Sequence, residues 1–397
     1  MRTIKYIKIW DWLLIASAIL APMTSLRFGS KIGPGELAIF IWSLRVIDYR
    51  SIRITYLERF FIAFLFAILI GSFCGLLIAP NELSRSGWRT WVFLAVISHA
   101  LICYLNRCSK EYITRLFNVI CIASTLVQFL LYEYSVNVSR SFMGLQIWYS
   151  SRYSGGGSNP HQVALPLCGF GFWFAYKVLK EKKIIYAPLA YFSFFLMKQT
   201  QSSTGEASVY LSFVVLFVLW VLHLEQSRSR KIMFLLIGAV VAVGLAYIFR
   251  NKLYKLAYDW ISADKNGWGR FRLWSELGRT FKKSPFFGLG VGCHTYLTNS
   301  SRMGEFHNSY FDILAATGLF GFFIFSLFTY RLVSKILRNE PMLLPIILVL
   351  YGYNIAGFSV RRLPYWIITV FVLAIVEHPE PEYMRIPDRR RRQWLYE

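Results

Sequence analysis

Charged residues are scarce in this chain of 397 residues and make up only 16% of it. Hydrophobic residues account for 56% and aromatic residues for 18%, and the mean hydropathy is +0.44. Apolar runs long enough to cross a bilayer recur along the chain. The composition therefore excludes an ordinary soluble domain and predicts a polytopic membrane protein.

Hydropathy predicts an all-α fold, a single transmembrane domain over residues 1–397 with about twelve helices. The first apolar segment lacks a small-residue cleavage site and runs into Arg27 and Lys31, so we expect a retained span rather than a signal peptide. The predicted spans lie near residues 10–25, 33–47, 57–79, 88–105, 112–134, 161–179, 184–197, 207–224, 231–249, 308–330, 342–358 and 364–376.

Acidic residues are also few, 21 against 44 basic ones, which gives a net charge of +23. A nucleic-acid-binding protein can have this surplus, but here the basic residues concentrate in alternate loops, as expected for the cytoplasmic face of a membrane protein. Both termini are therefore predicted to be cytoplasmic, with the basic tail on anionic membrane lipid and no nucleic acid bound. The inner loops carry Arg45, Arg50, Arg53 and Arg59; Arg107, Lys110 and Arg115; Lys177, Lys180, Lys182 and Lys183; Arg228, Arg230 and Lys231; Arg331, Lys335 and Arg338; and Arg385 with Arg389 to Arg392.

Neither the cysteines nor any known catalytic motif indicates a function for this chain. Of the six cysteines, only Cys293 is predicted outside the spans and the inner face, so neither a disulfide framework nor a metal-ligand spacing is present. The outer side has no DxD, no HExxH, no phosphate-binding glycine loop and no nucleophile elbow. We therefore expect chemistry without a metal or cofactor, and no nucleotide hydrolysis.

Two outer loops are unusually long, residues 135–160 and 250–307, and loops of such length are usually functional or disordered. The second is predicted to be a large periplasmic loop with an amphipathic helix that lies at the outer membrane surface, with its aromatic face in lipid or against the bundle. Its apolar face holds Phe271, Trp274, Gly278 and Phe281, and Ser284-Pro285 ends it.

The segment Phe306-His307-Asn308-Ser309 stands between this loop and an apolar helix. Ser309 and Asp312 are spaced as a Ser-x-x-Asp cap, so His307 is predicted just before the helix begins. The positive end of a helix favours a neutral imidazole that can act as a base, and it also attracts a diphosphate. The alternative is that His307 merely caps the helix or hydrogen-bonds to its end.

Several segments in the same order resemble the O-antigen ligase and polymerase family of bacterial membrane glycosyltransferases, over residues 150–375. The family's histidine motif is similar to EFHNSYFDILAATGLFGFF, in which Gly318 and Gly321 are expected to thin the helix for close packing. Its arginine-aromatic helix resembles GRFRLWSELGRTFKKSPFFGLGVG, with Arg270 at the motif arginine. Its Asn-Pro segment resembles SRYSGGGSNPHQVAL, which begins near Arg152, and its closing arginine turn resembles GFSVRRLPYWI.

One segment departs from the family pattern. Where the family often has Ser-Arg-Thr-Gly, this chain reads SSTG, with Ser203 in the arginine's place. Lys198 is then the candidate for the missing charge, and Arg272 is a further substrate-binding candidate. His161, which follows the Asn-Pro pair, is expected either to cap its span or to touch the glycan.

The resemblance implies a metal-independent glycosyltransferase of the bacterial inner membrane whose active site is periplasmic. The donor would be a glycan linked to undecaprenyl diphosphate, and the acceptor either lipid A-core, for a ligase, or a growing glycan, for a polymerase. His307 would be the general base. Arg270, with Arg152 and Arg361 or Arg362, would hold the diphosphate and stabilise its growing charge. A secondary transporter is the alternative from another class, but it should show two similar halves and interrupted helices.

Overall fold

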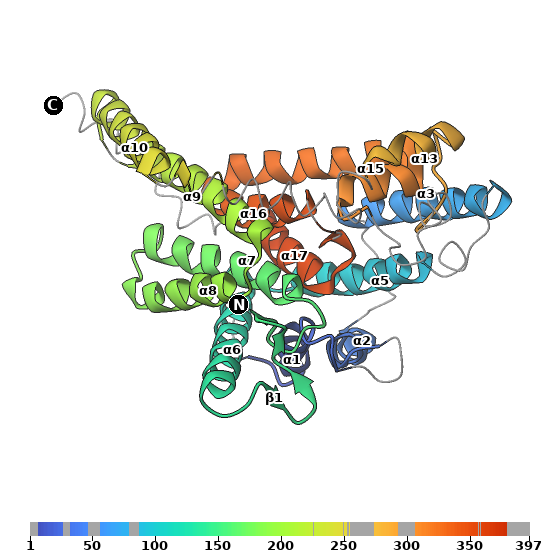
Figure 1. The fold of residues 1–397 in the computed structure, drawn as a ribbon, viewed down its shortest axis with the longest axis horizontal. Helices are drawn as coiled ribbons and strands as arrows, with labels where there is room; N and C mark the ends of the chain where they lie inside the picture. Colours follow the sequence, from blue (N-terminus) through green and yellow to red (C-terminus); the bar gives the residue numbers. More distant parts are fainter. Residues whose placement is uncertain are drawn as a thin grey trace.

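The computed structural model describes residues 7–26, 32–46, 56–78, 87–224, 226–248, 250, 251, 254, 274–292, 306–355, 357 and 359–378. These residues form thirteen α-helices, three short 3-10 turns and two small β-hairpins, which confirms the all-α prediction (Figure 1). The helices are α1 (Asp11–Leu20), α2 (Pro34–Val46), α3 (Tyr56–Ile78), α5 (Trp88–Leu105), α6 (Lys110–Asn137), α7 (His161–Leu179), α8 (Ala187–Gln199), α9 (Ser203–His223), α10 (Arg228–Ile248), α13 (Leu277–Lys283), α15 (Ser309–Asn339), α16 (Leu344–Asn354) and α17 (Leu363–Glu377).

Each of the apolar segments predicted from hydropathy coincides with one of these helices. In the described part of the chain, six helices are long and apolar enough to cross a membrane, namely α3, α5, α6, α7, α9 and α15. Three shorter apolar stretches, Asp11–Leu20, Pro341–Asn354 and Leu363–Glu377, accompany them. The protein is therefore a helical membrane protein, while the total of about twelve spans and the sidedness of the loops stay predictions.

The centre of the bundle is built around α17 and α7. Every residue of α17 from Leu363 to Val376 is buried, and 89% of the apolar window of α7 is buried. A helix that is apolar on all sides belongs inside a bundle rather than on its surface. Around this centre α3 lies against α15, α8 against α7, and α9 against α16 (Figure 1).

The long helix α15 is broken at Gly318, whose φ of +62° and ψ of −164° are not helical. A Cβ atom at this position would lie 2.3 Å from the carbonyl carbon of Phe286, so only glycine fits. The predicted close packing at Gly318 is therefore confirmed, although the break in the helix was not predicted. Gly321 also allows close packing, because a Cβ atom added there would lie only 3.1 Å from the Cβ of Ala67 on α3.

The loop of residues 285–290, which begins with a turn, runs beside the break and pairs with it. It completes the backbone hydrogen bonds that the two half-helices leave open, since a helix end has unpaired C=O or N–H groups. Non-helical backbone at membrane depth is tolerated when protein pairs it in this way. The four bonds, 2.8–3.1 Å long, run from Leu289 N to Ala315 O, Gly290 N to Ala316 O, Leu319 N to Pro285 O and Phe320 N to Phe286 O.

The helix predicted in the large outer loop is present as α13, which ends at Lys283 ahead of Ser284-Pro285. It packs against α15, and the Trp274 ring just before it meets the edge of Phe311 at 5.5 Å between centroids. Trp274 therefore lies against the bundle. Phe271, Arg270 and Arg272 lie outside the described residues.

The other long outer loop folds into two hairpins that hydropathy did not predict. Strand β1 (Ser141–Phe142) pairs with β2 (Leu145–Gln146), and β3 (Trp148–Tyr149) pairs with β4 (Arg152–Tyr153). Residues with positive φ at both turns, such as Gly144 (+82°) and Ser150 (+57°), suit two-residue hairpins. The second hairpin carries Arg152 back to the bundle.

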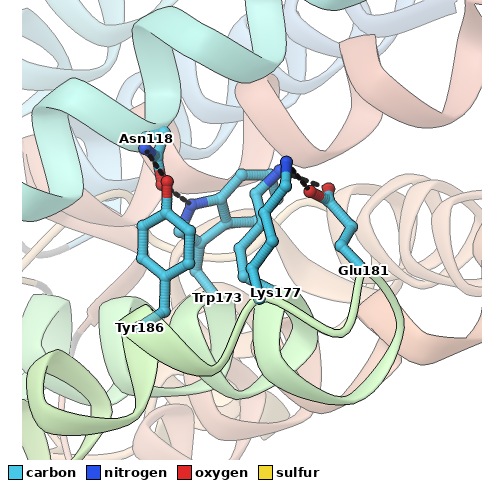
Figure 2. A network of polar contacts seen from close by, with 6 residues as sticks. Asn118, Trp173, Lys177, Glu181 and Tyr186 are labelled. Atoms are coloured by element: carbon cyan, nitrogen blue, oxygen red, sulfur yellow. Dashed lines mark hydrogen bonds and ion pairs between the residues drawn. The ribbon is translucent and has the colours of Figure 1, made fainter.

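A polar network stabilises the end of the bundle where α7 is followed by α8, opposite the end that carries the two hairpins (Figure 2). The buried ammonium of Lys177 lies 4.7 Å from the centre of the Trp173 ring and pairs with Glu181. The Trp173 indole donates to the Asn118 amide oxygen at 3.2 Å, and the Asn118 amide donates to the Tyr186 hydroxyl at 2.9 Å. This end carries the basic residues predicted to be cytoplasmic.

Candidate functional site

His307 lies in the turn that leads into α15. The N-cap of this helix is Asn308, whose side-chain oxygen accepts hydrogen bonds from the backbone N–H groups of Tyr310 and Phe311 at 3.0 and 3.2 Å. The predicted Ser-x-x-Asp cap that begins at Ser309 is therefore wrong, and so is the alternative that His307 caps the helix. His307 does stand just before the helix, as predicted, but Asn308 rather than Ser309 caps it.

The backbone of His307 is in the left-handed region, with a φ of +52°. This conformation costs a non-glycine residue about 1 kcal/mol, and such strain is often found at functional sites. The preceding residue, Phe306, is fully buried, and its carbonyl accepts a hydrogen bond from the indole of Trp274 at 3.0 Å. The backbone on both sides of His307 is thus held by hydrogen bonds.

Ser309 joins the start of α15 to the segment after α16. Its backbone N–H donates to the carbonyl of Gly357 at 3.1 Å, and its hydroxyl donates to the same carbonyl at 2.7 Å. The hydroxyl also accepts from the N–H of Ser359 at 3.0 Å and lies 3.1 Å from the side-chain oxygen of Asn354. These bonds bring the 3-10 turn η3 (Ser359–Arg361) beside the His307 turn.

Arg361 and Arg362 follow one another in this turn, and the backbone N–H of Arg362 donates to the carbonyl of Ser359 at 2.9 Å. Burial, and then the positive charge of Arg362, lower the pKa of Arg361 to about 10. Arg361 is therefore still charged at neutral pH, next to a second guanidinium. A bound anion would offset both the burial and the repulsion, so this pair favours anion binding.

A second group of polar side chains surrounds Ser202, the N-cap of α9, whose hydroxyl oxygen accepts the backbone N–H of Gly205 at 3.2 Å. The Tyr353 hydroxyl donates to it at 2.9 Å, and Nδ1 of His161 lies 2.8 Å away. The N-cap of α7 is Pro160, with no side-chain bond. The alternative that His161 caps its helix is therefore wrong, because its ring is held against α9 instead.

Arg152 approaches the same place from the second hairpin. Its Nε donates to the carbonyl of Thr200, two residues before Ser202, at 2.9 Å. Partial burial lowers the pKa of Arg152, although the nearby hydroxyls of Tyr353 and Tyr149 act in the other direction. In the described part of the chain this guanidinium forms no ion pair, and its terminal nitrogens donate no hydrogen bond. Arg152 is therefore a half-buried cation whose terminal nitrogens remain able to donate hydrogen bonds.

The last two residues of α16, Tyr353 and Asn354, connect the two groups. Tyr353 reaches Ser202 and its partner His161, while Asn354 lies against Ser309 and, at 3.4 Å, the Tyr365 hydroxyl. Five of the eight residues predicted from the sequence thus lie at one polar end of the bundle. They are Arg152, His161, His307, Arg361 and Arg362.

The remaining predictions fare differently. Lys198 lies in the last turn of α8, exposed, and Arg152 rather than Lys198 bonds to the chain just before Ser202. Sequence reasoning missed Tyr353 and Asn354, since a tyrosine and an asparagine at the end of an apolar run give no signal. Ser202 had one, because serine ahead of a helix is a favoured N-cap.

The chemistry that these residues offer is cationic and basic. Over the residues that the structure describes, no group of three or more His, Cys, Asp or Glu side chains could hold a metal ion. The five cysteines within those ranges form no disulfide with one another. The site offers guanidinium groups for an anion and two histidines that can exchange protons.

Residues 188–326 match the family model Wzy_C, described as O-antigen ligase. The match runs from α8 into α15 and includes the His307 turn, while the resemblance noted in the sequence spans residues 150–375. No curated protein matches the chain.

Proposed function

Because the chain carries an O-antigen ligase family domain, whose members are glycosyltransferases, we propose that it moves a glycan from undecaprenyl diphosphate to a hydroxyl of lipid A-core. The transfer takes place on the periplasmic side of the bacterial inner membrane, without a metal. The observation that supports this best is the gathering of Arg152, Arg361 and Arg362 around the end of α16, beside the His307 turn.

In the proposed reaction the acceptor oxygen attacks the anomeric carbon of the donor sugar, and His307 accepts its proton. The bond between that carbon and the diphosphate oxygen breaks, and the diphosphate leaves with the electron pair. Arg152 and the Arg361–Arg362 pair neutralise the charge that grows on it. Attack opposite the leaving group inverts the anomeric centre.

Further substrate contacts are proposed for the remaining candidate residues. Arg270, the other catalytic candidate, and Arg272 lie outside the described residues, and Arg270 stands where the family motif has its arginine. Lys198 and His161 are proposed to contact the glycan. The His161 ring is already held by the hydroxyl of Ser202, the N-cap of α9. The polyprenyl tail enters sideways between apolar helices.

The base assignment is tested with His307→Ala. We expect donor affinity within about twofold of wild type but transfer lowered by about 10²–10⁴-fold, the usual contribution of a general base. Donor binding and turnover are measured on purified protein in nanodiscs. The matched control is His378→Ala, at the far end of α17, where the imidazole only contacts the Ala374 carbonyl at 2.7 Å. Full turnover in His307→Ala would remove His307 from the mechanism.

The second candidate within the family is a polymerase that extends the lipid-linked glycan by repeat units. A ligase and a polymerase share the fold and the donor, so only their products distinguish the two functions. In a deletion strain, undecorated core with unattached polymer supports the ligase, whereas core carrying one repeat unit identifies the polymerase. The transporter alternative loses support because family members are glycosyltransferases, and because residues 285–290, not a substrate, close the one helix break described above.

A further inference from the structure

Asp312, in the first turn of α15, is a buried acid that the proposed reaction does not use. Its side chain is 6% exposed. One carboxylate oxygen, Oδ1, accepts the backbone N–H of Phe306 at 2.8 Å, and the carboxyl group also interacts with the backbone N–H of Asn308. Phe306 and Asn308 are the two neighbours of His307. The carboxyl group therefore holds the turn by a hydrogen bond to the residue before that histidine and lies close to the residue after it.

The second oxygen, Oδ2, is buried without a hydrogen-bond partner. An unpaired polar atom in the interior is unfavourable, and an apolar residue would avoid this penalty while filling the same space. Helix capping does not explain the acid either, because Asn308 already caps α15. The remaining explanation for a buried acid here is that it holds the turn in which His307 has a φ of +52°.

We propose that Asp312 is a positioning residue, which keeps the His307 turn in its left-handed conformation and so aims the imidazole at the acceptor hydroxyl. The inference rests on the proposed role of His307 as the base. Asp312 contacts neither donor nor acceptor in this arrangement. It affects proton transfer only through the turn, so its loss should lower kcat and leave donor binding alone.

The test uses Asp312→Ala and Asp312→Asn in the full-length protein. Alanine removes both acceptor oxygens, whereas asparagine keeps one for the Phe306 N–H. Hydrogen exchange, followed by mass spectrometry on peptides that cover residues 306–311, reports the turn independently of activity. We expect Asp312→Ala to lose protection at Phe306 and about tenfold or more in kcat, with the KM for the donor within about twofold. Asp312→Asn should keep most of both.

Thr317→Val is the matched control. Thr317 is equally buried on the same helix, but its hydroxyl only donates to the Ile313 carbonyl, so exchange and kcat should not change. If Asp312→Ala does not accumulate, Asp312→Leu takes its place, because leucine also removes both acceptor oxygens, and protection at Phe306 and kcat must then fall together. Protection lost with kcat intact, or kcat lost with protection intact, overturns the proposal. An active His307→Ala instead contradicts the base assignment, and the exchange data still report whether Asp312 holds the turn.

Discussion

At the scale of single residues, Arg152 bears on the clearest departure of this chain from the family pattern that it resembles. The sequence has Ser203 where that pattern often has arginine, and Lys198 was the predicted substitute. In the structure Arg152 reaches this segment from a hairpin, and the hydrogen bond from its Nε to the Thr200 carbonyl fixes it there. A guanidinium anchored through Nε still presents its terminal nitrogens to a planar anion.

We therefore expect Arg152→Gln to weaken donor binding by about 10- to 100-fold, since a charged hydrogen-bond partner contributes about 1.5–3 kcal/mol. The measurement is donor affinity in nanodiscs. Arg140→Gln is the matched control, because Arg140 is an exposed arginine of the same outer loop that lies over the Trp148 ring at 5.6 Å. Equal losses in both variants would indicate a general effect of charge rather than a site at Arg152.

At the scale of secondary-structure elements, the broken helix α15 shows where prediction from sequence ends. Hydropathy located every apolar helix, because burial in lipid or in a bundle depends on composition over a long window. The break at Gly318 depends on pairing with residues 285–290, a partner that no local pattern reveals. The two hairpins were missed for a related reason, since their strands are only two residues long.

The same distinction holds for the site. The histidine and arginine positions could be predicted because their order along the chain resembles a family pattern. Their mutual arrangement could not, since Tyr353 and Asn354, which join the two groups, lie at the end of an apolar helix. The cap was misassigned by one residue because Asn308 and Ser309 are both favourable N-caps, and the contact between Ser309 and Gly357 decides between them.

The break is tested with Gly318→Ala. The alanine would have to adopt a positive φ, and its methyl group would lie 2.3 Å from the carbonyl carbon of Phe286. We therefore expect a loss of about 3 kcal/mol or more in the free energy of unfolding. Gly144→Ala separates the two effects, because Gly144 has a φ of +82° with nothing within 4 Å and should lose only about 1 kcal/mol. Thermal unfolding in detergent measures both. Similar losses would mean that Phe286 does not pack against the break.

At the scale of the whole molecule, the bundle has two polar ends with different tasks. Helix α7 reaches both, with His161 at the site and Lys177 in the network of Figure 2, about 24 Å apart along the helix. At the Lys177 end, burial raises the pKa of Glu181, but the hydrogen bonds and charges of Lys177 and Lys183 outweigh it and leave that pKa below its usual value. This ion-pair contribution is therefore present at neutral pH and is lost as the pH falls through the lowered pKa.

The separation of the ends predicts that Lys177→Met destabilises the protein without changing donor binding. Methionine keeps the stem over Trp173 but removes a buried charge pair, and Glu181 retains Lys183, so we expect a loss of about 1–3 kcal/mol at neutral pH that shrinks in acid. Lys180→Met is the matched control, since its pair with Glu340 spans 3.8 Å and its side chain is 45% exposed, and it should change stability by less than about 0.5 kcal/mol. Thermal unfolding between neutral and acidic pH, beside donor affinity, measures both. Weaker donor binding in Lys177→Met would show that the two ends are coupled through α7 and that the network of Figure 2 does more than hold the bundle together.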